Sequence, residues 1–373
     1  MNYLKEESLV PPDLLQVLLG PIAAAEDALA RLDERVARSE VGPGFSKRAD
    51  FFDSVSSMWV GGELVHIEDL VLHDAQMDIR APSHELVIAH RIVRARRRVS
   101  RNDPGWSISR AGIMALAGVA EEPSAEAEPA DRGGEGVELD LVDHDALSPE
   151  LAEIDEVLAR TQWLVNGNAA VEQRKRVSET SVGELVIRDP DWDEGERIGE
   201  WLDLVKKVEG LPATLAAAVL WDAWEYLEPL QRQHWLGQVL VSDFLRSRGK
   251  VRSHLLAYAV GLRDIPRERR RARDRTTRLI AYLDAMNAVA AAGMKDIDRL
   301  TLAKRQLERR AIGKRSTSSL PTAIDLLLSR PIVSAHMVAK AAKVTPRGAL
   351  NLVSELGVRE MTGRGRYRAW GIL

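Results

Sequence analysis

Polar and basic side chains near the C-terminus recur at spacings suited to contacts with duplex DNA. Arg347 and Asn351 are four residues apart, so on a helix they lie one turn apart on the same face. In the major groove, arginine pairs with guanine and asparagine with adenine. Three neighbours could bind phosphates through a hydroxyl or an ammonium group: Ser334, Lys343 and Thr345.

Two further arginines, Arg364 and Arg366, flank a glycine close to the end of the chain. The sequence predicts short strands at 358–361 and 366–372, joined by a glycine-containing turn at 362–365. Arginines at the tip of such a hairpin could reach the DNA backbone or the minor groove.

The charge of this segment supports the same interpretation. From Arg330 to the end, Lys and Arg occur eight times and Asp and Glu twice, whereas the whole chain carries a net charge of −4. A local basic excess is the electrostatic footprint of phosphate binding. The alternative is a small helical protein-binding domain whose arginines are merely solvated.

Three helices must position these side chains. Apolar spacing predicts the first at 320–329, and a second, at 335–342, begins after Ser334, a favourable N-cap residue. Thr345 caps the third helix, 346–356, which contains Arg347 and Asn351. Two short helices joined by a tight turn, followed by a basic hairpin, predict a winged helix-turn-helix.

The turn between the second and third helices departs from the usual pattern. Lys343 stands where a glycine is common, and a residue with a side chain adopts that conformation at modest cost. Ala339 is small enough for close helix packing, and Gly357 ends the third helix.

Composition predicts a mainly α fold: a multi-helix scaffold plus a C-terminal winged helix-turn-helix with a small β-hairpin. Ala, Leu, Arg and Glu are abundant, while Phe and Tyr are few. Residues 121–138 are acidic and rich in Pro and Gly, which predicts a flexible linker. The expected domains are an N-terminal helical region (1–118), an acidic linker (119–147), a helical domain (148–313) and the winged helix-turn-helix (318–373).

Apolar periodicity predicts the scaffold helices. Residues 13–39 should form two pieces broken at Gly20-Pro21, and 41–45 should be a loop. The remaining predicted helices are 48–58, 82–101, 148–173, 194–208, 211–226, 229–248, 252–261, 266–292 and 295–312.

Two arginine-dense stretches could form a second phosphate-binding surface. The alternative for both is a solvated helix face, with acids such as Glu268 and Asp274 pairing with some of the arginines. One stretch is 91–101, and the other contributes Arg267, Arg270, Arg271 and Arg273.

The segment Trp221–Gly249 resembles the core of Fic-fold proteins. In that family a loop histidine deprotonates a target hydroxyl, and a glycine-rich anion hole with an arginine holds nucleotide phosphates. Pro229 and the Leu/Val-rich helix after Gly237 correspond, but Glu228 stands at the histidine position and the Gly-Asn-Gly-Arg run is absent. The resemblance therefore implies a degenerate scaffold without catalytic residues. A plain helical domain is the alternative.

Two further segments suit the Fic comparison. Phe52–Trp59 resembles a worn version of a Ser-rich helix found early in many long Fic proteins. Such proteins also often end in a winged helix much like Leu320–Leu373.

The whole chain also resembles an uncharacterised, often plasmid-borne, alphaproteobacterial family with a C-terminal helix-turn-helix. That likeness is strongest at Gly61–Ala75, at Ile265–Arg275 and in the tail, and it implies no known activity.

Several function classes find no support in the sequence. The chain has no cysteine, which excludes disulfides and thiolate sites. His66 and His73, beside Asp69 and Asp74, lack a third ligand, so we expect no metal and no cofactor. No apolar run is long enough to cross a bilayer, and the N-terminus lacks the pattern of a signal peptide, so we expect a cytoplasmic protein without a membrane partner.

The sequence therefore predicts a sequence-specific duplex-DNA-binding protein, a homodimeric transcriptional regulator and not an enzyme. Residues 13–39 or 266–312 could form the dimer surface, and an effector ligand stays unspecified. One alternative is a divergent Fic-type nucleotidyl or phosphoryl transferase with a winged-helix targeting module, in which His234 or Glu228 would be needed. Another is a protein-interaction adaptor that uses the acidic linker.

Overall fold

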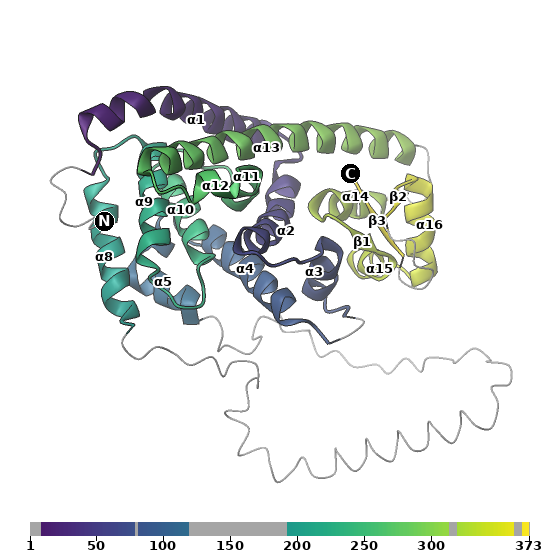
Figure 1. The fold of residues 1–373 in the computed structure, drawn as a ribbon. Helices are drawn as coiled ribbons and strands as arrows, with labels where there is room; N and C mark the ends of the chain where they lie inside the picture. Colours follow the sequence, from purple (N-terminus) through teal and green to yellow (C-terminus); the bar gives the residue numbers. More distant parts are fainter. Residues whose placement is uncertain (1–8, 79–80, 119–191, 313–318, 362–367, 373) are drawn as a thin grey trace, which may run out of the picture. The chain divides into compact units, whose positions relative to one another are not determined.

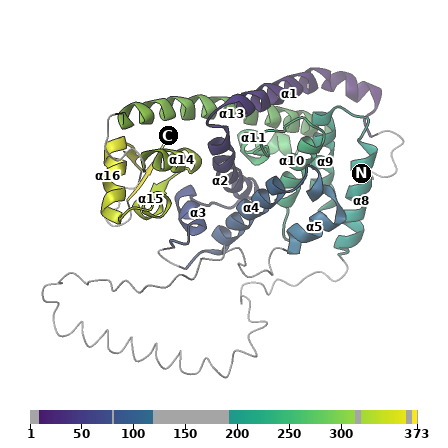
Figure 2. The same cartoon turned by 180° about the vertical axis from the view of Figure 1, so that it is seen from behind.

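Two long helices, α1 (Pro12–Arg38) and α13 (Arg275–Ala311), lie side by side and cover the shorter helices (Figures 1 and 2). The computed structural model describes residues 9–78, 81–118, 192–312, 319–361 and 368–372. In α1 the buried residues recur every three or four positions, from Leu18 through Ile22 to Val36, as expected of an amphipathic helix.

The predicted break at Gly20-Pro21 is wrong. Pro21 lies inside the continuous helix α1. The proline removes one backbone hydrogen bond, but the apolar stripe continues on both sides of it, with Leu18 and Ile22 buried. Packing of this stripe against the core outweighs the local cost.

Most of the other predicted scaffold helices are present with shifted ends, and the short elements at 67–74, 106–108 and 110–117 were not predicted. The predicted loop at 41–45 is helical, because Pro43 stands in the first turn of its helix, where a missing N–H is tolerated. These helices are α2 (Gly42–Gly61), α3 (Ile67–Asp74), α4 (His84–Arg101), η1 (Trp106–Ile108), α5 (Arg110–Ala117), α8 (Glu194–Lys207), α9 (Ala213–Leu227), α10 (Leu236–Ser247), α11 (Tyr258–Asp264) and α12 (Arg267–Arg270).

Several predicted helix bounds are wrong in the second half of the scaffold. The helices predicted at 229–248 and 252–261 begin only at Leu236 and Tyr258. The helices predicted at 266–292 and 295–312 form instead the short α12 and the single long α13. Gly293 lies at that predicted break, but it is buried within α13, and an added Cβ would contact Leu32 of α1. The glycine thus allows two helices to approach closely.

The described residues on both sides of 119–191 belong to one compact unit that includes the winged helix. One continuous apolar core joins α1, α9, α10 and α13, and in it the rings of Trp201 and Trp224 meet edge to face with centroids 5.4 Å apart. The predicted N-terminal region and middle domain therefore share a core where they are described. The predicted linker (119–147) and the predicted helix 148–173 lie outside the described residues.

The C-terminal domain has the predicted three helices in the predicted places. They are α14 (Leu320–Ser329), α15 (Ala335–Ala342) and α16 (Pro346–Leu356). Three short antiparallel strands accompany them in the order β1-β3-β2: β1 (Val333–Ser334), β2 (Arg359–Glu360) and β3 (Ala369–Gly371). The sequence pattern missed β1, since two residues are too few to show strand periodicity.

Candidate nucleic-acid interface

Local backbone chemistry fixes the two helices of the helix-turn-helix. The hydroxyl oxygen of Ser334 accepts a hydrogen bond from the Met337 amide at 3.2 Å and so begins α15. The hydroxyl oxygen of Thr345 accepts one from the Gly348 amide at 3.1 Å and so begins α16. Between them Lys343 adopts the left-handed conformation, with φ 52° and ψ 47°. The lysine thus takes the place predicted for it in the turn.

Helix α16 has one buried face and one exposed face. Ala349, Leu352 and Leu356 are buried against the rest of the domain. Arg347 and Asn351 are exposed together, as their spacing predicts. Leu350 lies between them with 40% of its surface exposed, and the sequence analysis missed it. An exposed leucine there could contact the methyl group of thymine.

The residues predicted to bind phosphate differ in their exposure to solvent. Lys343 and Thr345 are exposed beside the start of α16. Ser334 is 8% exposed, and its hydroxyl donates a hydrogen bond to the sulfur of Met77 at 3.4 Å. Its prediction as a phosphate ligand is wrong, because the buried hydroxyl is already used by Met77 and by the Met337 amide. Arg364 and Arg366 lie outside the described residues.

An ion pair fastens the base of the predicted wing. Nε and Nη2 of Arg368 donate to one carboxylate oxygen of Glu360 at 2.9 and 2.7 Å, and this hydrogen bonding raises the pKa of Arg368. The same guanidinium lies over the ring of Trp370, 5.3 Å from its centroid. Arg359 on β2 is exposed, so a basic group stands at the base of the hairpin.

Three arginines attach the winged helix to the scaffold. Arg310 of α13 donates to the carbonyl oxygens of Leu356 and Gly357 at 2.7 and 3.0 Å, satisfying the C-terminal end of α16. Arg48 of α2 donates to the carbonyl oxygens of Arg330 and Ile372 at 2.6 and 3.0 Å. The third is the side chain of Arg330, which enters a cluster of charged groups.

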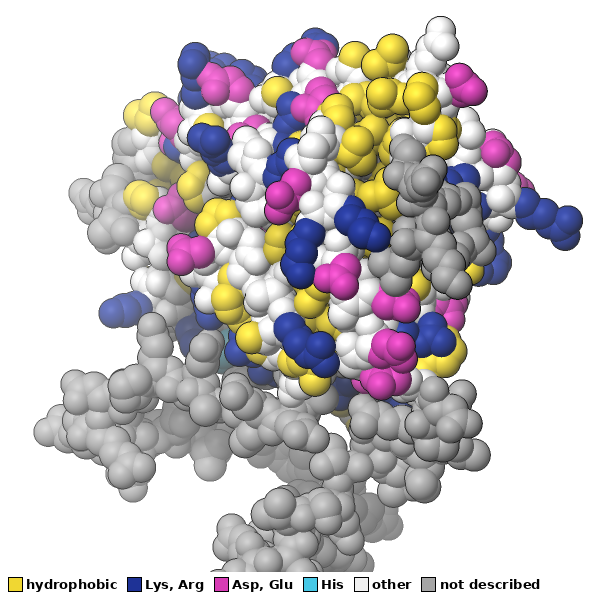
Figure 3. Space-filling model, turned by 90° about the vertical axis from the view of Figure 1, so that its left-hand side faces the viewer, with side chains coloured by type: hydrophobic (Ala, Val, Ile, Leu, Met, Phe, Trp, Pro, Cys, Tyr) yellow, Lys and Arg dark blue, Asp and Glu magenta, His cyan; other side chains and the backbone are white. Residues whose placement is uncertain are grey.

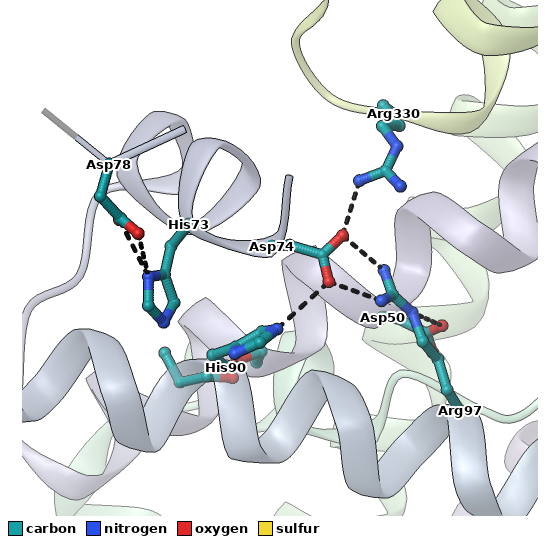
Figure 4. Close-up of polar contacts among 9 residues, drawn as sticks. Asp50, His73, Asp74, Asp78, His90, Arg97 and Arg330 are labelled. Atoms are coloured by element: carbon teal, nitrogen blue, oxygen red, sulfur yellow. Dashed lines mark hydrogen bonds and ion pairs between the residues drawn. The ribbon is translucent and has the colours of Figure 1, made fainter. Parts of the chain in front are cut away.

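That cluster centres on the carboxylate of Asp74 (Figure 4). Arg330 donates to it at 2.6 Å, Arg97 at 2.5 and 3.1 Å, and His90 lies 3.3 Å away. The Asp74 side chain is only 3% exposed. Although burial opposes ionisation, these hydrogen bonds hold the pKa of Asp74 well below its usual range. His73 pairs instead with Asp78 at 2.9 Å.

The predicted second basic surface is only partly exposed. Arg267, Arg271 and Arg273 are exposed, but Arg270 is 8% exposed, and its Nε donates to the carbonyl oxygen of Ile265 at 3.0 Å. The inclusion of Arg270 in that surface is wrong, since its side chain holds the loop before α12 in place.

The arginine-dense run 91–101 also contains a buried member. Arg96 is fully buried. It pairs with Asp53 and with Asp50, the latter at 3.0 Å, and donates to the carbonyl oxygen of Leu255 at 2.9 Å. A structural role for Arg96 explains why an arginine falls on the apolar face of α4.

Glu228 and His234, the two residues of the transferase alternative, line a cavity of about 370 Å³. Arg271 and Glu225 line it too, and burial raises the pKa of Glu225. Gly237, which precedes the helix compared with the Fic core, lies directly against the indole ring of Trp224. The absence of a side chain at this position therefore serves helix packing.

Comparisons with known proteins give two family matches and one relative. Residues 320–373 match the model described as "HTH DNA binding domain", and residues 186–312 match "Protein of unknown function (DUF1612)". The chain is 43% identical over 381 residues to "Uncharacterized protein y4cF" of Sinorhizobium fredii (strain NBRC 101917 / NGR234), covering 95% of this chain and 97% of the relative. The chain belongs to the family of this Sinorhizobium protein.

These matches decide several predictions. The C-terminal domain is a helix-turn-helix DNA-binding domain, as predicted for 318–373, and the likeness to an uncharacterised helix-turn-helix family is confirmed. The resemblance to Fic-fold proteins is not confirmed, because the scaffold segment matches a family of unknown function. Among the described residues, no helix is long and apolar enough to span a membrane.

Proposed function

We propose that this protein binds duplex DNA sequence-specifically as a homodimer and regulates transcription in the cytoplasm. The observation that carries the proposal is the exposed face of α16, where Arg347 in the first turn and Asn351 one turn later lie together. In helix-turn-helix proteins the N-terminal residues of the second helix contact base edges. Lys343 and Thr345, exposed beside that end, would bind phosphates.

Selection of bound duplexes from a random pool tests this proposal. We expect a palindromic site, because a two-fold symmetric dimer binds two equivalent half-sites. A pool that stays random after repeated rounds would contradict sequence-specific binding, and a single asymmetric half-site would contradict the homodimer.

Substitutions on α16 test the roles of the two residues with the selected duplex. Arg347→Ala and Asn351→Ala should each cost about 1–3 kcal/mol of binding free energy and relax the preference at one base pair. Arg110→Ala is the matched control, since Arg110 is an exposed arginine of α5 outside both arginine-dense stretches. Fluorescence anisotropy measures all three. Equal losses for Arg347→Ala and Arg110→Ala would mean that only overall charge matters.

Exposed apolar side chains favour α1 as part of the dimer surface. Val17 and Leu19 are 56% and 58% exposed. Figure 3 shows hydrophobic side chains gathered in the upper part of the face at the α8 end of this unit. We expect Val17→Glu with Leu19→Glu to shift the protein toward monomer in sedimentation analysis. Leu302→Glu on α13, where Leu302 is 58% exposed, tests the other predicted surface.

We also propose that the scaffold has no transferase activity. Glu228 stands where a Fic-type base would be a histidine. The Gly-Asn-Gly-Arg run that would form the nucleotide-binding anion hole is absent from the sequence. Incubation with labelled ATP should leave proteins unlabelled. Label transfer that is lost in His234→Ala or Glu228→Gln would overturn this proposal.

A further inference from the structure

A cavity of about 340 Å³ lies where the scaffold meets the DNA-binding domain. Side chains of α2, α11 and α13 line one part of it. Pro331, Ile332, Met361 and Ile372 of the DNA-binding domain line another. The volume is within the range of small-molecule sites, which are concave and mostly apolar with a few polar groups. Phe45, Phe52 and Val289 supply apolar walls.

Four polar side chains that line this cavity each have an atom without a hydrogen-bond partner among the described residues. Three of these residues are nearly fully buried: Arg48 is 2% exposed, Ser56 1% and His254 6%. Buried polar atoms are rarely left unpaired, since each such atom costs free energy. The four atoms are Nε of Arg48, Oγ of Ser56, Nε2 of His254 and Nε of Arg299. Their concentration around one cavity points to a polar ligand.

The charge of the cavity favours an anion. Arg48, Arg263 and Arg299 line it, against the acids Glu68 and Asp296. Asp296 already pairs with Arg299 at 2.6 Å. Burial, and the positive charge of Arg299, lower the pKa of Arg48 to about 10. One negative charge would balance the remaining positive charge and accept the unpaired N–H groups of both arginines.

We propose that this cavity binds a small organic carboxylate, with the carboxylate at Arg48 and Arg299 and its hydrocarbon part against Phe45, Phe52 and Val289. The ligand would act as an effector, because Arg48 also holds the carbonyl oxygens of Arg330 and Ile372 in the DNA-binding domain. The proposal of a ligand site depends only on the residues of the cavity. The effector role rests on the proposed DNA-binding function.

The first experiment measures ligand binding by the full chain without DNA. Benzoate and hexanoate are the probes, and benzamide and hexanamide are neutral controls of the same shape. Because a ligand that binds only the folded state stabilises it, the carboxylates should raise the unfolding midpoint with increasing concentration, and the amides should not. Equal effects of acid and amide, or no shift with either carboxylate at millimolar concentration, would overturn the proposal.

Variants locate the binding site. Ala292→Leu fills the cavity, and Ala291→Leu is its control, since Ala291 is an exposed neighbour on α13. Arg299→Gln removes a lining cation, and Lys295→Gln removes an exposed cation of the same helix outside the cavity. We expect Ala292→Leu and Arg299→Gln to weaken carboxylate binding about tenfold or more, the worth of one charge-assisted hydrogen bond. Unchanged affinity in both variants would place the ligand elsewhere and overturn the proposal.

A second experiment tests the effector role with the selected duplex. Saturating benzoate should change the dissociation constant for DNA about fivefold or more, and Ala292→Leu should abolish that change. If benzoate binds and the DNA affinity stays the same, the site stands and the effector role is wrong. If no duplex binds under any condition, the proposed function fails, while the first experiment still decides the ligand site.

Discussion

His254 is a buried residue whose charge state depends on its surroundings. It packs edge to face against Phe45, with ring centroids 5.5 Å apart, and Ser253 lies 3.0 Å from its Nδ1. Burial lowers its pKa to about 4, and the positive charge of Arg96 adds to this effect, while the carboxylate of Asp33 opposes it. The imidazole is therefore neutral in the folded protein at pH 7.

This burial predicts a loss of stability in mild acid. The unfolded chain binds a proton at His254 near pH 6.5, whereas the folded chain does not until about pH 4. The free energy of unfolding should therefore fall as pH drops through this window, by about 2 kcal/mol between pH 7 and pH 5. Urea unfolding at a series of pH values measures it.

Two variants separate His254 from other groups that titrate in this window. His254→Gln should remove most of the slope, although its stability at pH 7 is lower. His66→Gln should keep the slope, since His66 is exposed. An unchanged slope in His254→Gln would show that other groups cause the acid sensitivity.

Single residues differ in how far the sequence predicts them. Arg347, Asn351 and Lys343 are exposed as expected, because helix periodicity and caps within one short segment determine their direction. Ser334 and Arg96 were misjudged, because distant partners decide their environment. Met77 is 257 residues from Ser334 in the sequence, and Leu255 is 159 residues from Arg96.

Among the elements, the turn between α15 and α16 places a residue with a side chain in a conformation that favours glycine. Lys343 has φ 52°, a conformation that costs residues with a Cβ about 1 kcal/mol and costs glycine nothing. Its side chain is exposed beside Thr345, at the start of α16. Backbone conformation alone would favour glycine here, and the exposed ammonium group of Lys343 lies where a phosphate contact is proposed.

Lys343→Gly separates the two roles of this residue. We expect stability to be unchanged or to rise by up to about 1 kcal/mol, because glycine relieves the turn but adds entropy to the unfolded chain. DNA affinity should fall for all sequences alike, and its salt dependence should decrease by about one phosphate contact. Unfolding curves and salt titrations by anisotropy measure both effects.

Lys340→Gly on α15 is an informative contrast, since Lys340 is exposed in a helix rather than in a left-handed turn. It should destabilise by about 1 kcal/mol. If Lys343→Gly destabilised as much, relief of the turn would be negligible. If the DNA affinity of Lys343→Gly had the same salt dependence as that of the unaltered protein, Lys343 would not contact phosphate.

Element boundaries show where sequence periodicity stops being informative. The helices of the DNA-binding domain were predicted almost to the residue, because N-caps and C-caps mark their ends. Pro21 and Gly293 carry the usual signals for a break and lie inside helices. Tertiary packing decides at both positions, and a single sequence does not contain that information.

At the scale of the whole molecule, the scaffold and the DNA-binding domain are joined by polar contacts over long sequence distances. Asp74 and Arg330 are 256 residues apart, and Arg48 and Ile372 are 324 residues apart. The sequence predicted a separate C-terminal domain, which is right for its local structure. Its attachment could not be predicted, because nothing in the segment 318–373 specifies which acid Arg330 meets.

The Asp74 cluster should therefore contribute to stability and to the attachment of the winged helix. Asp74→Asn removes the carboxylate that Arg330 and Arg97 share, and among the described carboxylates Arg97 keeps only Asp50, 4.0 Å away. We expect a loss of about 2–3 kcal/mol, below the full value for a buried pair, because Arg97 and Arg330 are 30% and 27% exposed. Because the pKa of Asp74 is held well below its usual range, this difference should stay constant above about pH 4.

Asp78→Asn is the matched control, since Asp78 is 30% exposed and pairs with His73. It should cost less than about 1 kcal/mol. Amide exchange adds a spatial readout: Asp74→Asn should speed exchange in α3 and in the first turns after Arg330, while the interior of α9 exchanges as before. Equal destabilisation by Asp74→Asn and Asp78→Asn would mean that the carboxylate of Asp74 does not hold the winged helix to the scaffold. The same conclusion would follow if the stability lost in Asp74→Asn disappeared between pH 7 and pH 5.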